Sequence, residues 1–106
     1  MIMPYKMEIN GIEYQIRDEE INALERYKQT GELPGHFLRA VLENNFVNAI
    51  CFADQHNLQN LPAFAKYLVW ELPGNAWGNT EKIIRWVNHN GMSMYFFDSS
   101  EKENSK

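Results

Sequence analysis

Three histidines and one aspartate are the residues of this sequence that could bind a metal ion. They are His36, His56, His89 and Asp54. Imidazole and carboxylate groups are common zinc ligands, but two ligands on one helix face must lie three or four residues apart. No pair among these four residues has that spacing. We therefore expect the histidines to lie at helix ends and to bond local carbonyl oxygens, and we predict no metal ion or cofactor.

The residue types that serve nucleophilic or acid–base catalysis do not form a recognisable motif. Cys51 is the single cysteine, so no internal disulfide can form, and Cys51 with His56 lacks the local pattern of a cysteine hydrolase. The acidic residues fall mostly on predicted exposed faces or helix starts, which leaves no pair suited to acid–base catalysis. Glycines stand alone at predicted helix ends and do not form a phosphate-binding loop. The sequence predicts a binding protein rather than an enzyme.

Aromatic residues are the strongest candidates for a binding surface. Tyr67, Trp70 and Trp77 lie within a short stretch of the chain, with Trp86 close behind. At 100° per residue, Tyr67 and Trp70 fall on the side of a helix opposite its main apolar stripe. This second row either packs beneath a sheet or forms a contact surface, because exposed Trp and Tyr are typical interface anchors. We expect Trp77, which precedes Gly78, to be tucked between the two helices that flank it.

The net charge of −4 excludes a general nucleic-acid binder. Backbone binding requires clustered Lys and Arg side chains that release counterions, and the ten basic residues here are scattered. No apolar run approaches the length of a membrane-spanning helix, and the first residues lack the apolar core of a signal peptide. The sequence therefore predicts a cytoplasmic protein without membrane contact.

The elements that position these residues can be read from turn and cap signals. Asn10-Gly11 divides two alternating runs, which predicts a β-hairpin over residues 6–16. Asp18 is the expected cap of the first helix, which should end before Gly31. Further helices are predicted over residues 37–43, 46–55, 61–71 and 80–89.

Specific contacts follow from these helices. In the third helix, Phe46, Ala49, Ile50 and Ala53 have the spacing of a core-facing stripe. Pro62 is tolerable only in a first helical turn, so the fourth helix should start between residues 59 and 61. Asn79 or Thr80 should cap the fifth helix, in which Glu81 can pair with Arg85.

The predicted fold is mainly α, of the α+β class, with about five short helices in a compact bundle and an N-terminal β-hairpin. Residues 92–97 are short, aromatic and bounded by turn residues, which favours a C-terminal strand over an extended plug. We expect residues 1–98 to form a single globular domain. Residues 99–106 contain no apolar anchor and are predicted to be a disordered tail.

A series of motifs within residues 31–90 resembles small helical proteins encoded in phage and prophage genomes, most of which have no assigned activity. The motifs are Leu33-Pro34-Gly35-x-Phe37-Leu38-x-Ala40-Val41-Leu42-x-Asn44, then Ala49, Ala53-Asp54, Asn57 and Leu68, and then Trp77-Gly78-x-x-Glu81-Lys82 and Trp86. In those proteins Ser-Pro often follows Trp-Gly, whereas this chain has Asn79-Thr80, which keeps a helix cap and loses the proline. The resemblance implies an accessory protein that acts inside an infected bacterium.

Two kinds of function fit that context. The first is a non-catalytic protein that binds a bacterial or phage protein, for example a counter-defence factor that blocks an immune complex. The second is an oligomeric sponge for a cyclic di- or trinucleotide signal, in which aromatic rings stack on bases and Arg39, Lys66 or Arg85 contact phosphates. The first is favoured, because the sequence contains no cluster of basic residues that marks a phosphate pocket.

Overall fold

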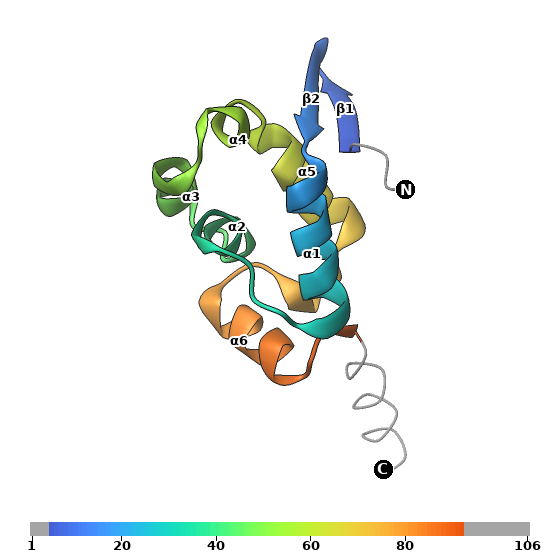
Figure 1. Ribbon diagram of the computed structural model, residues 1–106, viewed down its shortest axis with the longest axis vertical. Coiled ribbons are helices and arrows are strands. Elements are labelled where there is room, and N and C mark those ends of the chain that lie inside the picture. Colours follow the sequence, from blue (N-terminus) through green and yellow to red (C-terminus); the bar gives the residue numbers. More distant parts are fainter. Residues whose placement is uncertain (1–4, 93–106) are drawn as a thin grey trace.

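The computed structural model describes residues 5–92, which form an antiparallel hairpin and a set of helices packed beside it (Figure 1). The elements in chain order are β1 (Tyr5–Ile9), β2 (Ile12–Ile16), α1 (Asp18–Thr30), α2 (His36–Leu42), α3 (Phe46–Phe52), α4 (Gln55–Gln59), α5 (Leu61–Glu71), the 3-10 turn η1 (Gly74–Ala76) and α6 (Thr80–Asn88). The predicted mainly helical fold with an N-terminal hairpin is confirmed. The short helix α4 and the 3-10 turn η1 are additions to the predicted elements within these residues.

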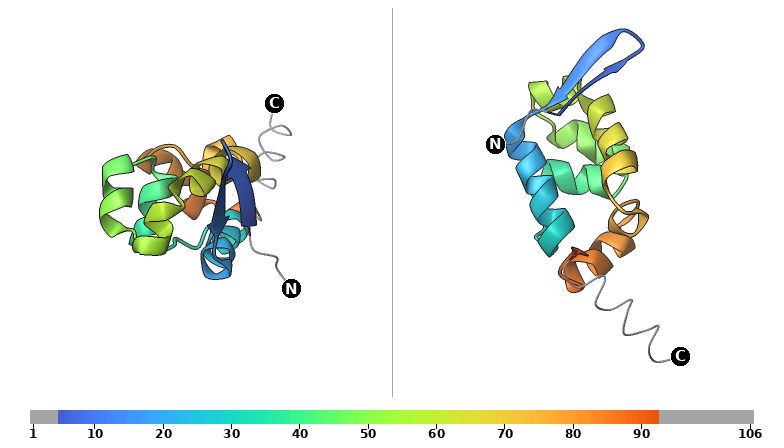
Figure 2. Two further views of the ribbon diagram at one scale, coloured as in Figure 1. Left: turned by 90° about the horizontal axis from the view of Figure 1, so that it is seen from above. Right: turned by 90° about the vertical axis from the view of Figure 1, so that its right-hand side faces the viewer.

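The hairpin turns at Asn10-Gly11, as the sequence predicts. Both residues have positive φ angles, +53° and +82°, which a two-residue turn of this kind requires and which Asn and Gly tolerate best. Ile9 pairs with Ile12, so no residue is left over in the register. The hairpin extends past the end of the helices in the right-hand view of Figure 2. Asn60 contacts the outer edge of β2, where its Oδ1 accepts a hydrogen bond of 2.8 Å from the Gln15 N–H.

Helix α1 begins one residue earlier than the cap prediction required. Asp18 is the first helical residue, and the N-cap position is occupied by Arg17, which makes no side-chain capping bond. The acidic residues of the first turn still suit the positive end of the helix dipole. The helix ends at Gly31 in the left-handed conformation, as predicted. Ile21, Leu24 and Tyr27 of this helix are buried.

The centre of the core joins α1 to the C-terminal part of the chain. The Trp86 indole on α6 donates a hydrogen bond of 3.0 Å to the Tyr27 carbonyl oxygen. The Tyr27 hydroxyl in turn donates one of 2.6 Å to the carbonyl oxygen of Ala76. Both rings are essentially excluded from solvent. Burial of aromatic side chains whose polar atoms are all bonded is strongly stabilising, so this contact holds α1, η1 and α6 together.

The predicted third helix is divided into two. Helix α3 stops at Phe52, and Asp54 then caps α4 by accepting a hydrogen bond of 2.8 Å from the Asn57 N–H. A carboxylate at this position competes with the helical backbone for an N–H group, which explains why the chain starts a new helix instead of continuing the old one. The prediction of one helix over residues 46–55 was therefore wrong.

Helices α5 and α6 begin where the sequence predicts. Pro62 lies in the first turn of α5, where its missing N–H costs nothing. Asn79 caps α6 by accepting a hydrogen bond of 2.9 Å from the Lys82 N–H. The ion pair between Glu81 and Arg85 is present at 2.9 Å. The predicted start of α5 and the predicted cap at Asn79 are thus confirmed.

The C-terminal predictions lie largely outside the described residues. Met92 is partly buried and packs against the core. The rest of the predicted strand over residues 92–97, and the tail over residues 99–106, are beyond the part of the chain that the structure describes. Within residues 5–92, no helix is both long enough and apolar enough to cross a membrane.

Gly31 provides a test of a close backbone contact, the one between Gly31 and Gly91. A Cβ atom at Gly31 would lie 2.8 Å from the Gly91 nitrogen, and the φ angle of Gly31 is +78°. We expect Gly31→Ala to lower the free energy of unfolding by about 2 kcal/mol or more, because backbone strain and a backbone clash add together. Urea denaturation measures this loss.

Gly74→Ala is the matched control for that substitution. A Cβ atom at Gly74 meets no atom within 4 Å. The control should change stability by about 0.5 kcal/mol or less. Equal effects of the two substitutions would contradict a special role for the contact between Gly31 and Gly91.

Candidate functional site

The structure separates the two aromatic residues that the sequence placed in one row. Tyr67 is 2 % exposed and lies beneath the hairpin, with its ring edge-on to Tyr5 at a centroid distance of 5.2 Å. Its hydroxyl donates a hydrogen bond of 2.9 Å to Glu25 on α1. Burial and this carboxylate raise the pKa of Tyr67 far above its ordinary value. Of the two alternatives for this row, packing beneath the sheet is therefore the one that Tyr67 adopts.

Trp70 lies at the surface instead. Its side chain is 63 % exposed, and the Lys66 ammonium group lies 5.3 Å from the centroid of its ring. A cation over an indole face is a favourable contact that the two residues make within α5. Trp77 is partly buried and packs against the core, which agrees with the expectation that it is tucked in. Of the three aromatic candidates, Trp70 alone presents most of its surface to solvent.

The basic candidates are distributed over three helices, and each contacts a residue of its own helix. Arg39 on α2 pairs with Glu43 at 3.0 Å, and Arg85 on α6 pairs with Glu81 at 2.9 Å. Lys66 on α5 contacts Trp70, as described above. Their charges are therefore engaged locally.

The histidines do not converge with other ligands. His89 lies at the end of α6 with its Nδ1 atom 2.8 Å from the Arg85 carbonyl oxygen, as expected for a helix end. His36 packs its ring against Phe52 at a centroid distance of 5.5 Å. In the part of the chain that the structure describes, no three His, Cys, Asp or Glu residues are close enough to hold a metal ion.

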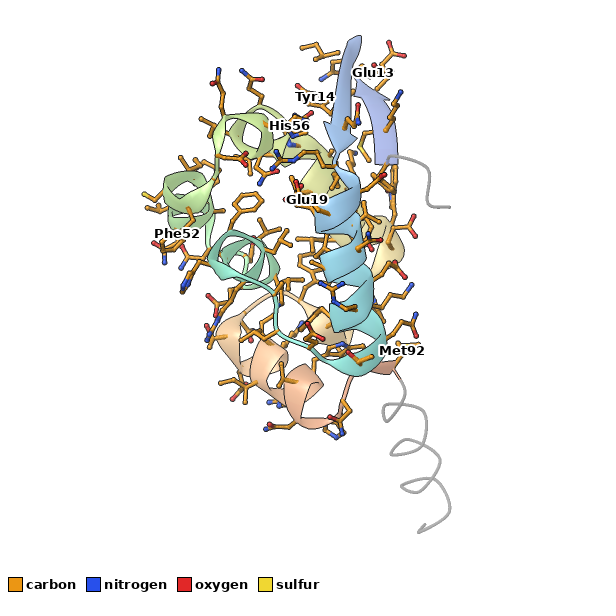
Figure 3. All side chains as sticks on the ribbon, viewed as in Figure 1. Glu13, Tyr14, Glu19, Phe52, His56 and Met92 are labelled. Carbon is orange, nitrogen blue, oxygen red and sulfur yellow. The ribbon has the colours of Figure 1, made fainter. Side chains whose placement is uncertain are left out.

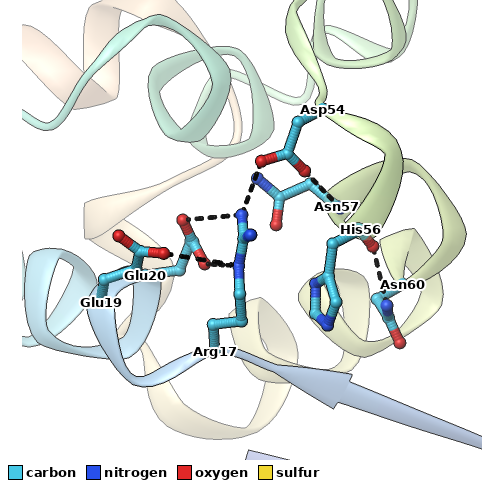
Figure 4. Close-up of polar contacts among 7 residues, drawn as sticks. All are labelled: Arg17, Glu19, Glu20, Asp54, His56, Asn57 and Asn60. Atoms are coloured by element: carbon cyan, nitrogen blue, oxygen red, sulfur yellow. Dashed lines mark hydrogen bonds and ion pairs between the residues drawn. The ribbon is translucent and has the colours of Figure 1, made fainter.

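A polar cluster joins the start of α1 to the start of α4 (Figure 4). The Arg17 guanidinium donates to Glu20 at 2.9 Å and to Asp54 at 2.7 Å. Two hydrogen bonds lower the pKa of the Asp54 carboxyl group below its usual value. The bond from the Asn57 N–H has the larger effect, and the bond from the Arg17 guanidinium has the smaller one. Because Glu20 and Asp54 already share an internal cation, we read the cluster as a structural tie between the two helices.

A cleft of about 290 Å³ lies beside this cluster. Its lining includes Glu19, Glu20 and Asn57. The Asn57 Oδ1 atom has no hydrogen-bond partner among the described residues, but protein atoms enclose it. A molecule in the cleft could not reach this oxygen without rearrangement.

The exposed face of α3 is the most unusual surface of the protein. The predicted core-facing stripe on this helix was wrong, because Phe46 is 71 % exposed and Ile50 is also exposed, while Ala49 alone is buried. Val47 is 65 % exposed and Phe52 is 52 % exposed. The helix contains no charged residue. Figures 1 and 3 show α3 at an outer margin of the fold, with Phe52 labelled on it.

An apolar groove runs beside this helix. It has a volume of about 280 Å³ and lies between α2, α3 and α5. Its lining includes Ala40, Val41, Phe46, Ala49, Leu61, Pro62, Ala65 and Leu68, together with Asn44 and Asn45. Among the described residues, none that lines the groove is charged. We call the groove, together with Phe46, Val47 and Ile50, the α3 face.

The sequence contained a signal for this surface that the stripe prediction overlooked. Six of the seven α3 residues are apolar, so apolar side chains point in all directions around the helix. A helix of this kind can bury all of its apolar side chains only when it lies at the centre of a fold. Two turns at the edge of a small domain cannot do so, which is why only Ala49 reaches the core.

No protein-family model, curated protein or solved structure matches the chain. The resemblance to phage-encoded proteins therefore stays a prediction. The fold and its surfaces define the chain only as a small, mainly helical domain with an N-terminal hairpin and an exposed apolar face.

Tyr67 and Trp70 make a matched test of the surface assignment. Tyr67→Ala should lower the free energy of unfolding by about 3–5 kcal/mol, because it empties a core position. Trp70→Ala should change it by about 1 kcal/mol or less, since an exposed ring loses little on truncation. Urea denaturation of both variants measures the difference, and a Trp70 variant as unstable as the Tyr67 variant would contradict it.

The tie between Arg17 and Asp54 predicts a pH dependence. The pKa of Asp54 is lowered from 3.8 in the folded protein, so its stabilising contribution is present above pH 3.8 and is lost as the pH falls through the folded value. Asp54→Asn keeps a good helix cap but removes the charge. The stability difference between wild type and variant should therefore shrink in urea titrations below pH 3.8. A pH-independent difference would show that the ion pair does not cause it.

Proposed function

We propose that this protein acts by non-catalytic binding of another protein, and that the α3 face is its contact surface. The observation that supports the proposal is the exposure of Phe46, Val47 and Ile50 on a helix without charge, next to an apolar groove. Covering apolar surface is favourable by about 25 cal/mol per Å². The fully buried centres of protein interfaces are likewise depleted of charged residues and enriched in aromatic ones.

The resemblance to phage-encoded proteins directs where the partner is sought. A bacterial or phage protein in the cytoplasm of an infected cell is the partner class that we propose, and an immune complex blocked by occupation of its surface is one form of it. Binding of this kind needs no catalytic group. It is consistent with a surface whose main chemical property is apolar area.

The alternative function, a nucleotide sponge, has less support. It requires basic side chains that meet phosphate groups close to an aromatic ring. Arg39, Lys66 and Arg85 lie on three helices and contact residues of their own helices. No observation in the described part of the chain favours this alternative over protein binding.

Site-specific photo-crosslinking tests the proposed surface directly. A benzophenone amino acid at Val47 on α3 should form adducts of defined mass with a protein when the chain is produced in bacteria, with or without phage infection. The control is the same probe at Ile84 on α6, an exposed aliphatic position of similar exposure on another helix. Adducts should form at Val47 and be absent or much weaker at Ile84.

The crosslinking result has a clear contrary outcome. Equal labelling at Val47 and Ile84, or labelling at Ile84 alone, would show that the α3 face is not the contact surface. Adduct masses from gel separation and mass spectrometry also report what the partner is.

A further inference from the structure

We infer that the α3 face binds the α3 face of a second copy of this chain, with Phe46 of each copy inserted into the groove of the other. The inference rests on the proposed function only in taking the α3 face to be a protein interface, and it names a second copy of the chain as the occupant in place of a different protein. Three properties of the face support it: the position of Phe46, the volume of the groove and the absence of charge.

The first property is that a protruding ring and a groove lie side by side on one chain. Phe46 lines the groove and yet leaves 71 % of its own surface exposed, so its ring stands at the rim. In a two-fold symmetric interface, residue i of one chain contacts residue j of the other, and j contacts i. A protrusion next to a matching groove meets this condition, because a two-fold axis close to Phe46 places each ring over the opposite groove.

The second property is the size of the groove. A cavity of about 150 Å³ lined by apolar side chains is large enough to bind benzene. The groove here measures about 280 Å³. It can therefore accept a phenyl ring from outside, and small residues such as Ala40, Ala49 and Ala65 in its lining leave the space for it.

The third property is electrostatic. Two identical chains of net charge −4 repel each other, and a symmetric interface over charged residues would bring like charges together. The α3 helix has no charged residue, and none of the described residues that line the groove has one. The α3 face is thus a surface on which two copies can meet without placing like charges in contact.

Sedimentation equilibrium of the full chain tests the inference. The wild type should show the mass of two chains, and Phe46→Ser, which removes the protruding ring, should show the mass of one. Ala65→Phe should also give a monomer, because it fills the groove from the exposed side of α5 without adding charge. Ile84→Ser is the control, a loss of exposed apolar surface on α6, and it should leave the dimer intact.

Mixing the two monomeric variants distinguishes reciprocal insertion from general stickiness. Phe46→Ser keeps a groove and Ala65→Phe keeps a ring, so the mixture restores one of the two contacts and should associate more strongly than either variant alone. Circular dichroism and urea denaturation should show all variants folded, since Phe46, Ala65 and Ile84 are exposed in the single chain.

The inference is overturned by a wild type that stays monomeric up to millimolar concentration. It is also overturned by a dimer that survives both Phe46→Ser and Ala65→Phe. If the chain is monomeric but the probe at Val47 still forms adducts with a different protein, the second-copy inference fails and the proposed function stands. If neither the dimer nor selective adducts at Val47 form, both fail.

Discussion

The hydrogen bond from the Trp86 indole to the Tyr27 carbonyl oxygen is the contact on which the arrangement of this chain most depends. It lies in the core and joins residues that are far apart in the sequence. The Tyr27 hydroxyl adds a second bond, to Ala76, so one residue of α1 holds both η1 and α6. An unpaired indole N–H or hydroxyl in that position would carry a desolvation cost, which makes the arrangement specific as well as stable.

The position of α3 follows from where this core lies. Helices α1, α2, α5 and α6 and strand β2 supply its large buried side chains, and the hairpin covers Tyr67. Helix α3 contributes only Ala49, so its larger apolar side chains stay in contact with water. A domain of this size has much surface for its volume, and it cannot enclose every apolar helix. The same constraint that makes the core small therefore produces the surface that we propose as an interface.

The polar contacts of the chain are structural in character. Arg17 links the first turn of α1 to the cap of α4, and Asn60 links the open edge of β2 to the α4 backbone through bonds to Gln15 and His56. These bonds satisfy groups at helix ends and at a strand edge, positions where backbone donors and acceptors lack regular partners. These polar side chains therefore stabilise the fold, and the binding surface that we propose consists mainly of apolar area.

Local signals in the sequence determined the ends of most elements. Asn10-Gly11, Pro62 and Asn79 each act through their own backbone geometry or a bond to a residue close in sequence, so they could be read without knowledge of the fold. Burial could not be read in the same way, because it depends on which elements cover each other. Tyr67 and Trp70 lie three residues apart on α5, yet the hairpin covers only Tyr67, and α3 looked like a core helix until its place at the edge was known. The sequence thus determined where most helices begin and end, apart from the break between α3 and α4, and only tertiary packing decided which apolar residues remain exposed.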